Sequence, residues 1–248
     1  MTSAPRELDR PAFYALRSSG WRDLVTLLHP PYTAWHLSYV ALGAVAAPVL
    51  HADRLGAALG AFFLAVGVSA HALDELAGRP LQTKLKRRTL IAFAAVGLAA
   101  AVAIGIAGCV LISPLLAPLV LTGALLVPAY NLELAGGWFH TDTWFALAWG
   151  GFPAFTGYFV NALTIRPAGI LVAAGCCLLS VAQRRLSTPA RELRRNTATV
   201  LGEQRLTDGT VRPLTPSALA APLEGALAAL WLALVCVAAG LVAARLWH

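Results

Sequence analysis

Residues 89–112 read TLIAFAAVGLAAAVAIGIAGCVLI, a run of 24 residues without a charged side chain. A helix that crosses a bilayer needs about 20 mostly apolar residues, so this run predicts a membrane span. The whole chain shares the bias, because 58% of its 248 residues are hydrophobic and only 12% are charged. A soluble domain of this length needs more charge to cover its surface. The sequence therefore predicts an all-α integral membrane protein.

Further apolar blocks of the same kind predict a bundle of about seven transmembrane helices. The blocks cover residues 35–50, 55–73, 89–112, 115–132, 144–163, 167–182 and 225–244. The first and sixth are shorter than the usual span of about 17 to 25 residues. Flanking polar side chains that reach the headgroups, or a thinner bilayer, can compensate for such brevity. Residues 29–248 are thus expected to form a single transmembrane domain.

Residues 1–28 are expected to form an amphipathic segment that lies in the membrane interface. Its apolar residues from Phe13 to Leu28 fall on one helical face, which suits an interfacial helix. The dipeptide Pro30-Pro31 then ends this segment before the first span.

The positive charges predict the orientation of the chain. With seven spans, 16 of the 19 Lys and Arg residues fall on one side of the membrane, in the N-terminal segment and in loops 74–88 and 183–216. The other side receives Arg54, Arg166 and Arg245. Because cytoplasmic loops are enriched in Lys and Arg, we expect a plasma-membrane protein with a cytoplasmic N-terminus and an external C-terminus.

The net charge of +7 is explained by this asymmetry and by contact with anionic lipid. No basic stretch has the aromatic interleaving of a nucleic-acid site, so no nucleic-acid partner is expected. The four cysteines all lie in apolar blocks without a His or Cys at metal-ligand spacing. They predict neither a disulfide framework nor a zinc site.

The chemistry is expected at the end of the second block, where His71, Asp74 and Glu75 follow a spacing of i, i+3 and i+4. On a helix these side chains project from one face. Two adjacent carboxylates can hold Mg²⁺, which prefers oxygen ligands and shares its shell with substrate phosphates. The alternative is a helix that simply leaves the bilayer here, with both acids solvated. The spacing alone leaves both interpretations open.

A family resemblance supports the first interpretation. The stretch from His71 to Arg79-Pro80-Leu81 follows His29-Pro30-Pro31-Tyr32-x-x-Trp35-His36-x-x-Tyr39 at the first span. The fifth span carries Gly150-Gly151-x-Pro153-x-x-x-Gly157-Tyr158. In order and placement these short motifs resemble the UbiA-type membrane prenyltransferases. In that superfamily the second span ends in Asn-Asp-x-x-Asp, and Arg-Pro-Leu follows closely. The resemblance covers roughly residues 30–201.

The resemblance implies a helical bundle around a central cavity that opens toward the cytoplasm and sideways to lipid. It also implies an enzyme that binds a prenyl diphosphate through Mg²⁺ and joins the prenyl group to an aromatic or other lipophilic acceptor. Under this interpretation Asp74 and Glu75 hold the metal, while His71 and Asn131 position substrate or water. Arg79 and Arg184 bind phosphate.

The sequence departs from the family pattern in three places. Ala70 and His71 occupy the positions of the first Asn and Asp. The second motif, Asp-x-x-x-Asp after the sixth span, is not present, and residues 183–195 contain Glu192 as their single acid. The chain also has two spans fewer than the usual nine. A rival hypothesis is therefore a non-catalytic lipid- or quinone-binding membrane protein that kept the fold and lost the full metal site.

The remaining candidates for substrate binding lie in three places. They are His36 in the first span, Tyr130 and Glu133 beside Asn131 at the end of the fourth, and Arg185 and Arg191 beside Arg184 after the sixth. His36 is an ionisable group at membrane depth, which suggests a role in the cavity. The arginines either bind diphosphate through their guanidinium groups or belong to a basic surface helix that begins at Thr188, with Pro189 at its first position.

Overall fold

The fold comes from a computed structural model, which describes residues 11–16 and 18–247. The described residues are mostly helical. Along the chain the helices are α1 Trp21–Leu27, α2 Pro30–Val45, α3 Ala52–Phe62, η1 Phe63–Ala70, α4 His71–Leu76, α5 Arg87–Leu111, η2 Pro114–Leu116, α6 Ala117–Asn131, α7 Asp142–Ala146, η3 Leu147–Gly151, α8 Phe152–Ala162, α9 Pro167–Arg195 and α10 Pro216–Leu246.

Several of these segments join into longer rods. The segments α3, η1 and α4 form one helix from Ala52 to Leu76, and η1 is a π-helical turn within it. Likewise α7, η3 and α8 form one helix, with η3 as its π-helical part. π-helical turns inside α-helices are rare and are frequent at functional sites.

Five helices among the described residues are long and apolar enough to cross a membrane. They are Ala52–Leu76, Arg87–Leu111, Pro114–Asn131, Pro167–Arg195 and Pro216–Leu246. Their outward faces are apolar, as Leu111 shows with 82% of its surface exposed. This pattern is that of a membrane protein, as the sequence predicted. The remaining two rods are α2, which has only 16 residues, and the helix from Asp142 to Ala162, which polar residues and glycines make less apolar.

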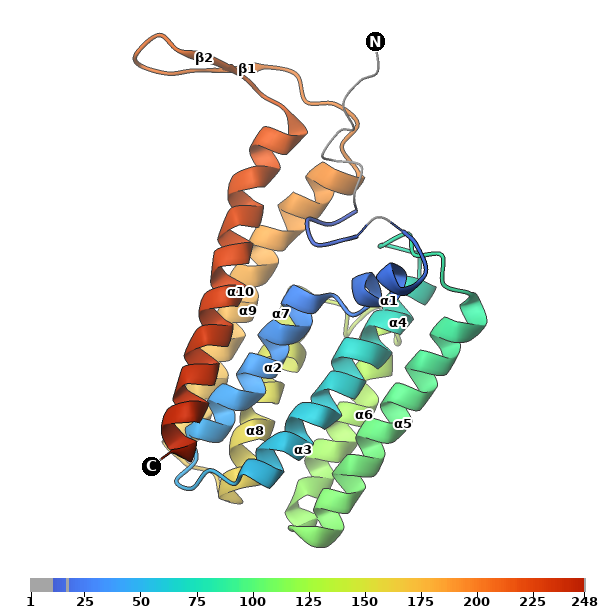
Figure 1. The fold of residues 1–248 in the computed structure, drawn as a ribbon, viewed down its shortest axis with the longest axis vertical. Helices are drawn as coiled ribbons and strands as arrows, with labels where there is room; N and C mark the ends of the chain where they lie inside the picture. Colours follow the sequence, from blue (N-terminus) through green and yellow to red (C-terminus); the bar gives the residue numbers. More distant parts are fainter. Residues whose placement is uncertain (1–10, 17, 248) are drawn as a thin grey trace.

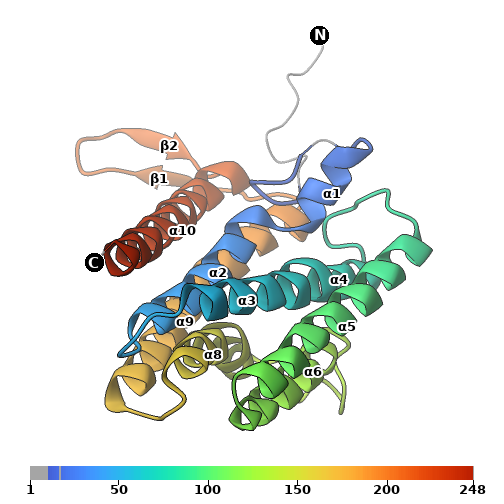
Figure 2. The same ribbon diagram turned by 60° about the horizontal axis from the view of Figure 1, so that its bottom comes forward.

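The helices pack side by side with α10 and α5 at opposite edges (Figures 1 and 2). At one edge α10 contacts α2 and α9, and at the other α5 contacts η1, α4 and α6. Between the edges α2 packs along α8. Their close approach requires glycine, because a Cβ on Gly43 would overlap the carbonyl oxygen of Ala154 and one on Gly157 would overlap that of Val40.

Three elements differ from the sequence-based expectation. The predicted sixth span ended at residue 182, but α9 continues to Arg195 and contains Pro189 in its interior. No separate helix begins at Thr188. The interfacial segment is helical only over α1, and the part of that prediction on residues 1–10 and 17 lies outside the described residues.

The chain is also not purely helical. Strands β1 Glu203–Arg205 and β2 Val211–Pro213 form an exposed antiparallel hairpin between α9 and α10 (Figure 1). The dipeptide Asp208-Gly209 at its tip is a hairpin signal that the all-α prediction overlooked. Gly209 has a φ of +87°, which favours glycine.

Candidate functional site

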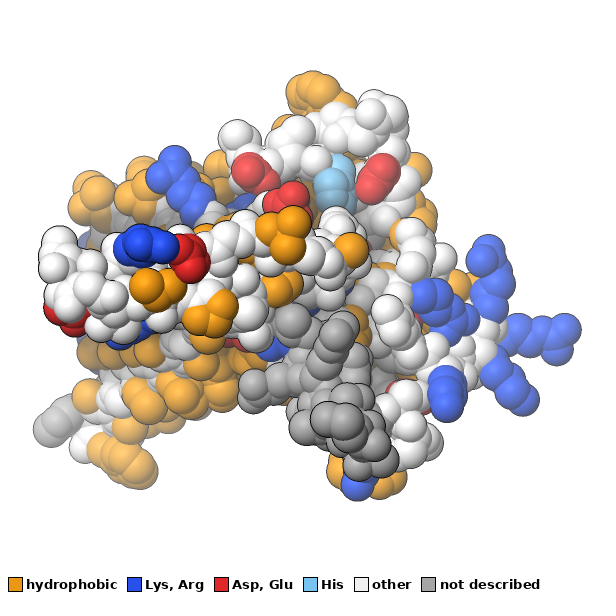
Figure 3. Space-filling model, turned by 90° about the horizontal axis from the view of Figure 1, so that it is seen from above, with side chains coloured by type: hydrophobic (Ala, Val, Ile, Leu, Met, Phe, Trp, Pro, Cys, Tyr) orange, Lys and Arg blue, Asp and Glu red, His pale blue; other side chains and the backbone are white. Residues whose placement is uncertain are grey.

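A polar cavity of about 440 Å³ lies at the end of the bundle where α2 begins and α4 and α6 end. Figure 3 views the molecule from this end and shows charged side chains gathered there. The polar and aromatic residues that line the cavity are Tyr14, His29, Tyr32, His36, His71, Asp74, Tyr130, Asn131, Glu133, His140, Phe145, Trp149, Gln183, Arg184, Ser187, Arg191 and Arg195. Distant segments of the sequence therefore meet at one site.

Most residues predicted from the sequence line this cavity. They are His36, His71, Asp74, Tyr130, Asn131, Glu133, Arg184 and Arg191. The other predicted residues, Glu75, Arg79 and Arg185, do not line it.

The Glu75 carboxylate turns away from the cavity and holds the loop that follows α4. Glu75 is fully buried. Its Oε1 accepts hydrogen bonds from the backbone N–H and the hydroxyl of Thr83, both at 2.8 Å. Its Oε2 accepts one from the backbone N–H of Leu81 at 3.0 Å. Because both oxygens of Glu75 accept from this loop, Asp74 alone of the two predicted Mg²⁺ ligands lines the cavity.

Arg79 has a structural role in the same loop. Its Nη1 donates to the carbonyl oxygens of Thr83 at 3.0 Å and Leu85 at 2.7 Å. The arginine therefore satisfies backbone acceptors of the loop rather than facing the cavity.

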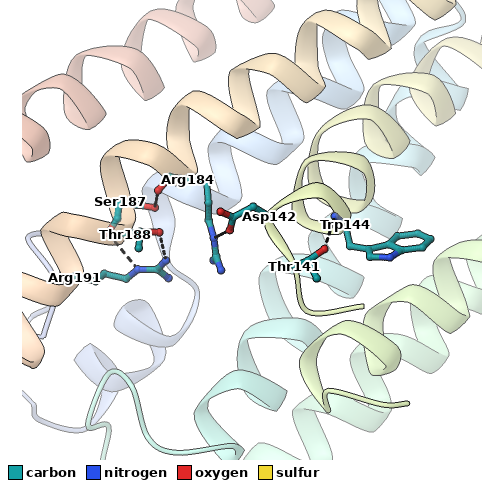
Figure 4. A network of polar contacts seen from close by, with 7 residues as sticks. All are labelled: Thr141, Asp142, Trp144, Arg184, Ser187, Thr188 and Arg191. Atoms are coloured by element: carbon teal, nitrogen blue, oxygen red, sulfur yellow. Dashed lines mark hydrogen bonds and ion pairs between the residues drawn. The ribbon is translucent and has the colours of Figure 1, made fainter. Parts of the chain in front are cut away.

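The uninterrupted helix α9 decides which arginines reach the cavity. Arg184 and Arg191 are seven residues apart, which places them on one helical face, whereas Arg185 is exposed on another. Arg184 pairs with Asp142 at 2.7 Å between Nε and Oδ1. Arg191 contacts its own helix, through the carbonyl oxygen of Ser187 at 3.3 Å and the hydroxyl of Thr188 at 3.4 Å. Figure 4 shows both arginines with these partners.

Two histidines in the cavity are oriented by backbone carbonyls. The Nδ1 of His36 lies 2.7 Å from the carbonyl oxygen of Trp149, in η3. The Nδ1 of His71 lies 3.2 Å from that of Gly67, in η1. A carbonyl oxygen only accepts, so Nδ1 of His36 donates and Nε2 of the neutral ring carries a lone pair.

The sequence analysis overlooked His29 as a cavity residue. Its ring stacks on that of His71, with centroids 4.1 Å apart and planes at 21°. Its Nδ1 lies 2.7 Å from the hydroxyl oxygen of Tyr14. His29 caps α2 with a φ of +44°, directly before Pro30 and Pro31. The two prolines were a usable signal, because they fix the helix start and therefore the position of the residue before it.

Three buried polar atoms in the cavity wall have no hydrogen-bond partner among the described residues. They are His29 Nε2, Tyr130 Oη and Gln183 Oε1. Buried polar groups are almost always paired, so each exception calls for an explanation. Three such atoms around one cavity provide hydrogen-bonding groups for water or for the polar part of a ligand.

An apolar cavity of about 130 Å³ adjoins the polar one. It lies among α3, η1, α5, α6, η3 and α8. Val66 and Trp149 line both cavities. A ligand with a polar head and a hydrocarbon tail can therefore contact both surfaces at once.

The cavity carries more positive than negative charge. Arg184, Arg191 and Arg195 line it together with the acids Asp74 and Glu133. Within residues 11–16 and 18–247, no group of three or more His, Cys, Asp or Glu side chains is arranged to hold a metal ion. The guanidinium groups that line the cavity are suited to bind an anion.

Comparison with known proteins finds no match to this chain among family models, curated proteins or solved structures.

Proposed function

We propose that this chain is a UbiA-like membrane prenyltransferase that transfers an isoprenoid group from a prenyl diphosphate to an aromatic or other lipophilic acceptor. The observation that carries the proposal is the contact of a cationic polar cavity with an apolar one at Val66 and Trp149. A prenyl diphosphate has matching parts, since a dense anion is joined to a hydrocarbon tail.

The chemistry begins with cleavage of the bond between the allylic carbon and the diphosphate oxygen, whose electron pair stays with the diphosphate. Arg184 and Arg191 stabilise the charge that develops on this leaving group. The faces of Trp149, Tyr130 and Phe145 stabilise the allylic cation. The nucleophilic atom of the acceptor then forms the new bond to carbon and loses its proton.

Asp74 is the proposed acceptor of that proton. Its carboxylate lines the cavity. Arg191 and Arg184 interact with it electrostatically, and among the described residues no hydrogen bond or ion pair holds its side chain. A carboxylate in such a position is able to act as a general base. His36 also lines the cavity, and the lone pair on its Nε2 accepts a hydrogen bond that positions the acceptor substrate.

Mg²⁺ was expected from the family resemblance, held by Asp74 and Glu75. The residues present do not fit that pair, because Glu75 is engaged by Leu81 and Thr83. The steps above therefore use only side chains of the chain itself.

The test is turnover in lipid nanodiscs with labelled geranyl, farnesyl and geranylgeranyl diphosphates and a panel of aromatic acceptors. We expect prenylated product, and an Asp74→Asn variant should lower its rate by about 100-fold, the usual scale for loss of a general base. Glu192→Gln removes an exposed acid of α9 and serves as the matched control with unchanged rate. Tight binding of a prenyl lipid without product under every condition would instead support the rival, a non-catalytic lipid- or quinone-binding protein.

For the membrane topology we infer seven crossings, with α2 and the helix from Asp142 to Ala162 completing the five apolar helices. The N-terminus then lies in the cytoplasm and the C-terminus outside the plasma membrane. Cysteine placed at Trp247 should react with an impermeant maleimide on intact cells, and cysteine at Asp208 in the hairpin should not. Labelling of Asp208→Cys on intact cells would show that the chain has the opposite orientation.

A further inference from the structure

The unpartnered nitrogen of His29 defines one part of an anion site. Nε2 of His29 is buried, and the ring lines the polar cavity. Burial, together with the nearby His71, Arg195 and Arg191, holds the pKa of His29 well below its ordinary value. The ring is therefore neutral at pH 7 and carries one proton.

The hydrogen bond with Tyr14 bears on which nitrogen carries that proton, because a protonated hydroxyl can donate to Nδ1 or accept from it. Burial raises the pKa of the Tyr14 phenol well above its ordinary value, so the phenol keeps its proton. Its hydroxyl is hydrogen-bonded to Nδ1 of His29. When the phenol donates this bond, Nδ1 is the acceptor and the proton of the neutral ring is on Nε2. His29 then presents a buried N–H donor to the cavity without an acceptor in the described chain.

Arg191 supplies the charge next to this donor. Its guanidinium lines the same cavity and is near enough to His29 to lower the pKa of that ring. Its hydrogen bonds are with uncharged groups of α9, and within the described residues no carboxylate is in salt-bridge contact with it. Asp74 lines the same cavity and interacts with Arg191 electrostatically, without a hydrogen bond between them. An arginine fork that no carboxylate engages by hydrogen bonds is suited to phosphate oxygens.

We propose that the cavity binds a phosphoryl group directly, through His29 Nε2–H and the Arg191 guanidinium, without a divalent cation. The inference rests on the proposed function only for the identity of the ligand as a prenyl diphosphate. It follows from the donor set, because the second carboxylate needed for a metal, Glu75, is bound to its own loop.

The experiment measures binding to the full chain in nanodiscs of neutral lipid, with EDTA and with Mg²⁺. The probes are inorganic pyrophosphate, geranylgeranyl diphosphate and, doped into the disc, phosphatidic acid as a competitor. We expect the affinity of geranylgeranyl diphosphate in EDTA to lie within about twofold of its value in Mg²⁺. Competition by pyrophosphate shows that a free diphosphate is sufficient for binding at the site. Competition by phosphatidic acid alone shows that the site binds a lipid headgroup. Either result supports a phosphoryl site.

Variants locate the site. Arg191→Gln should weaken binding about tenfold or more, which is the scale of one charge-assisted hydrogen-bond pair. His29→Phe keeps the ring and removes the donor, and should weaken binding about fivefold. Arg185→Gln changes the same residue type on the exposed face of α9 and should have no effect.

Binding that disappears in EDTA overturns the proposal, and so does an equal loss in Arg185→Gln and Arg191→Gln. The first result needs only the wild-type chain, so a misfolded variant does not obscure it. Failure of the proposed function is distinct, because metal-free binding with no transfer to any acceptor refutes the transferase and leaves the anion site in place.

Discussion

Asp74 and Glu75 are adjacent carboxylates with different surroundings. Asp74 faces a cavity lined by arginines, whereas Glu75 is enclosed by the loop that follows α4 and accepts three hydrogen bonds from it. Successive residues of a helix point in directions about 100° apart, so one of the two neighbours reaches the cavity while the other holds the loop. Two carboxylates that are adjacent in the sequence therefore need not bind the same ligand.

The same contrast holds for the basic residues. Arg79 satisfies carbonyl groups of the loop, Arg185 is exposed, and Arg191 lines the cavity. Each is an arginine near the same end of the bundle, and each differs in what surrounds its guanidinium. Arginines at this end of the bundle thus have three different surroundings. Arg79 is bound to a loop, Arg185 is exposed at the surface and Arg191 lines the candidate site.

The largest expected effect that tests this contrast is on folding. Glu75→Ala should lower the free energy of unfolding by about 3 kcal/mol or more, because it removes a buried charged acceptor and leaves buried donors unpaired. Thermal unfolding in detergent measures the loss. Limited proteolysis should then cut within residues 77–86.

Asp74→Ala is the matched control for Glu75→Ala. It removes the same functional group one residue earlier, from a wall of the cavity, and should change the free energy of unfolding by less than about 1 kcal/mol. Equal destabilisation by the two variants would contradict the division of roles between the neighbours.

Much of the architecture was accessible from the sequence, because lipid imposes a simple rule on it. A long uncharged run such as residues 89–112 has few folded alternatives in a bilayer, and α5 covers nearly the same residues. The end of α9 was not predictable in this way. The polar residues after 182 predict a loop, but the packing of Ser187 and Ala190, both buried, continues the helix through Pro189.

The candidate site was accessible in outline only. Ionisable residues at the ends of apolar blocks are conspicuous, which is why His71, Asp74 and Arg184 were found from the sequence. The orientation of Glu75 depends on where the N–H groups of Leu81 and Thr83 fall, and that is a property of the folded loop. The helical spacing predicted one face for His71, Asp74 and Glu75, yet a spacing of three or four residues is compatible with a range of directions that tertiary contacts select.

Small-residue motifs show the same limit. Gly56-x-x-x-Gly60 fits the pattern for close helix packing, but a Cβ on Gly56 would meet no atom within 4 Å. Gly157, in the motif that suggested the family resemblance, does lie at a close helix contact, against Val40. The pattern identifies candidates, and only the partner helix decides which of them are in contact.

The smallest expected effect is the pH dependence of stability that His29 causes. His29 lines the cavity, as Asp74 does, whereas Glu75 is buried in the loop. Its pKa in the folded chain lies well below the ordinary value, through burial first and then through His71, Arg195, Arg191 and His36. The unfolded chain therefore binds a proton near pH 6.5 that the folded chain does not bind. The contribution of His29 to stability is complete above that pH and is lost as the pH falls below it. The slope approaches about 1.4 kcal/mol per pH unit for one proton.

Thermal unfolding of the wild type and of His29→Phe between pH 5 and 8 isolates this effect, since the other histidines are present in both. The wild type should lose more stability than the variant below about pH 6.5. Saturating pyrophosphate should reduce that difference, because an anion next to His29 favours its protonated form. Parallel curves for the two proteins would mean that His29 is as easily protonated in the folded chain as in water, and the neutral N–H donor would lose its physical basis.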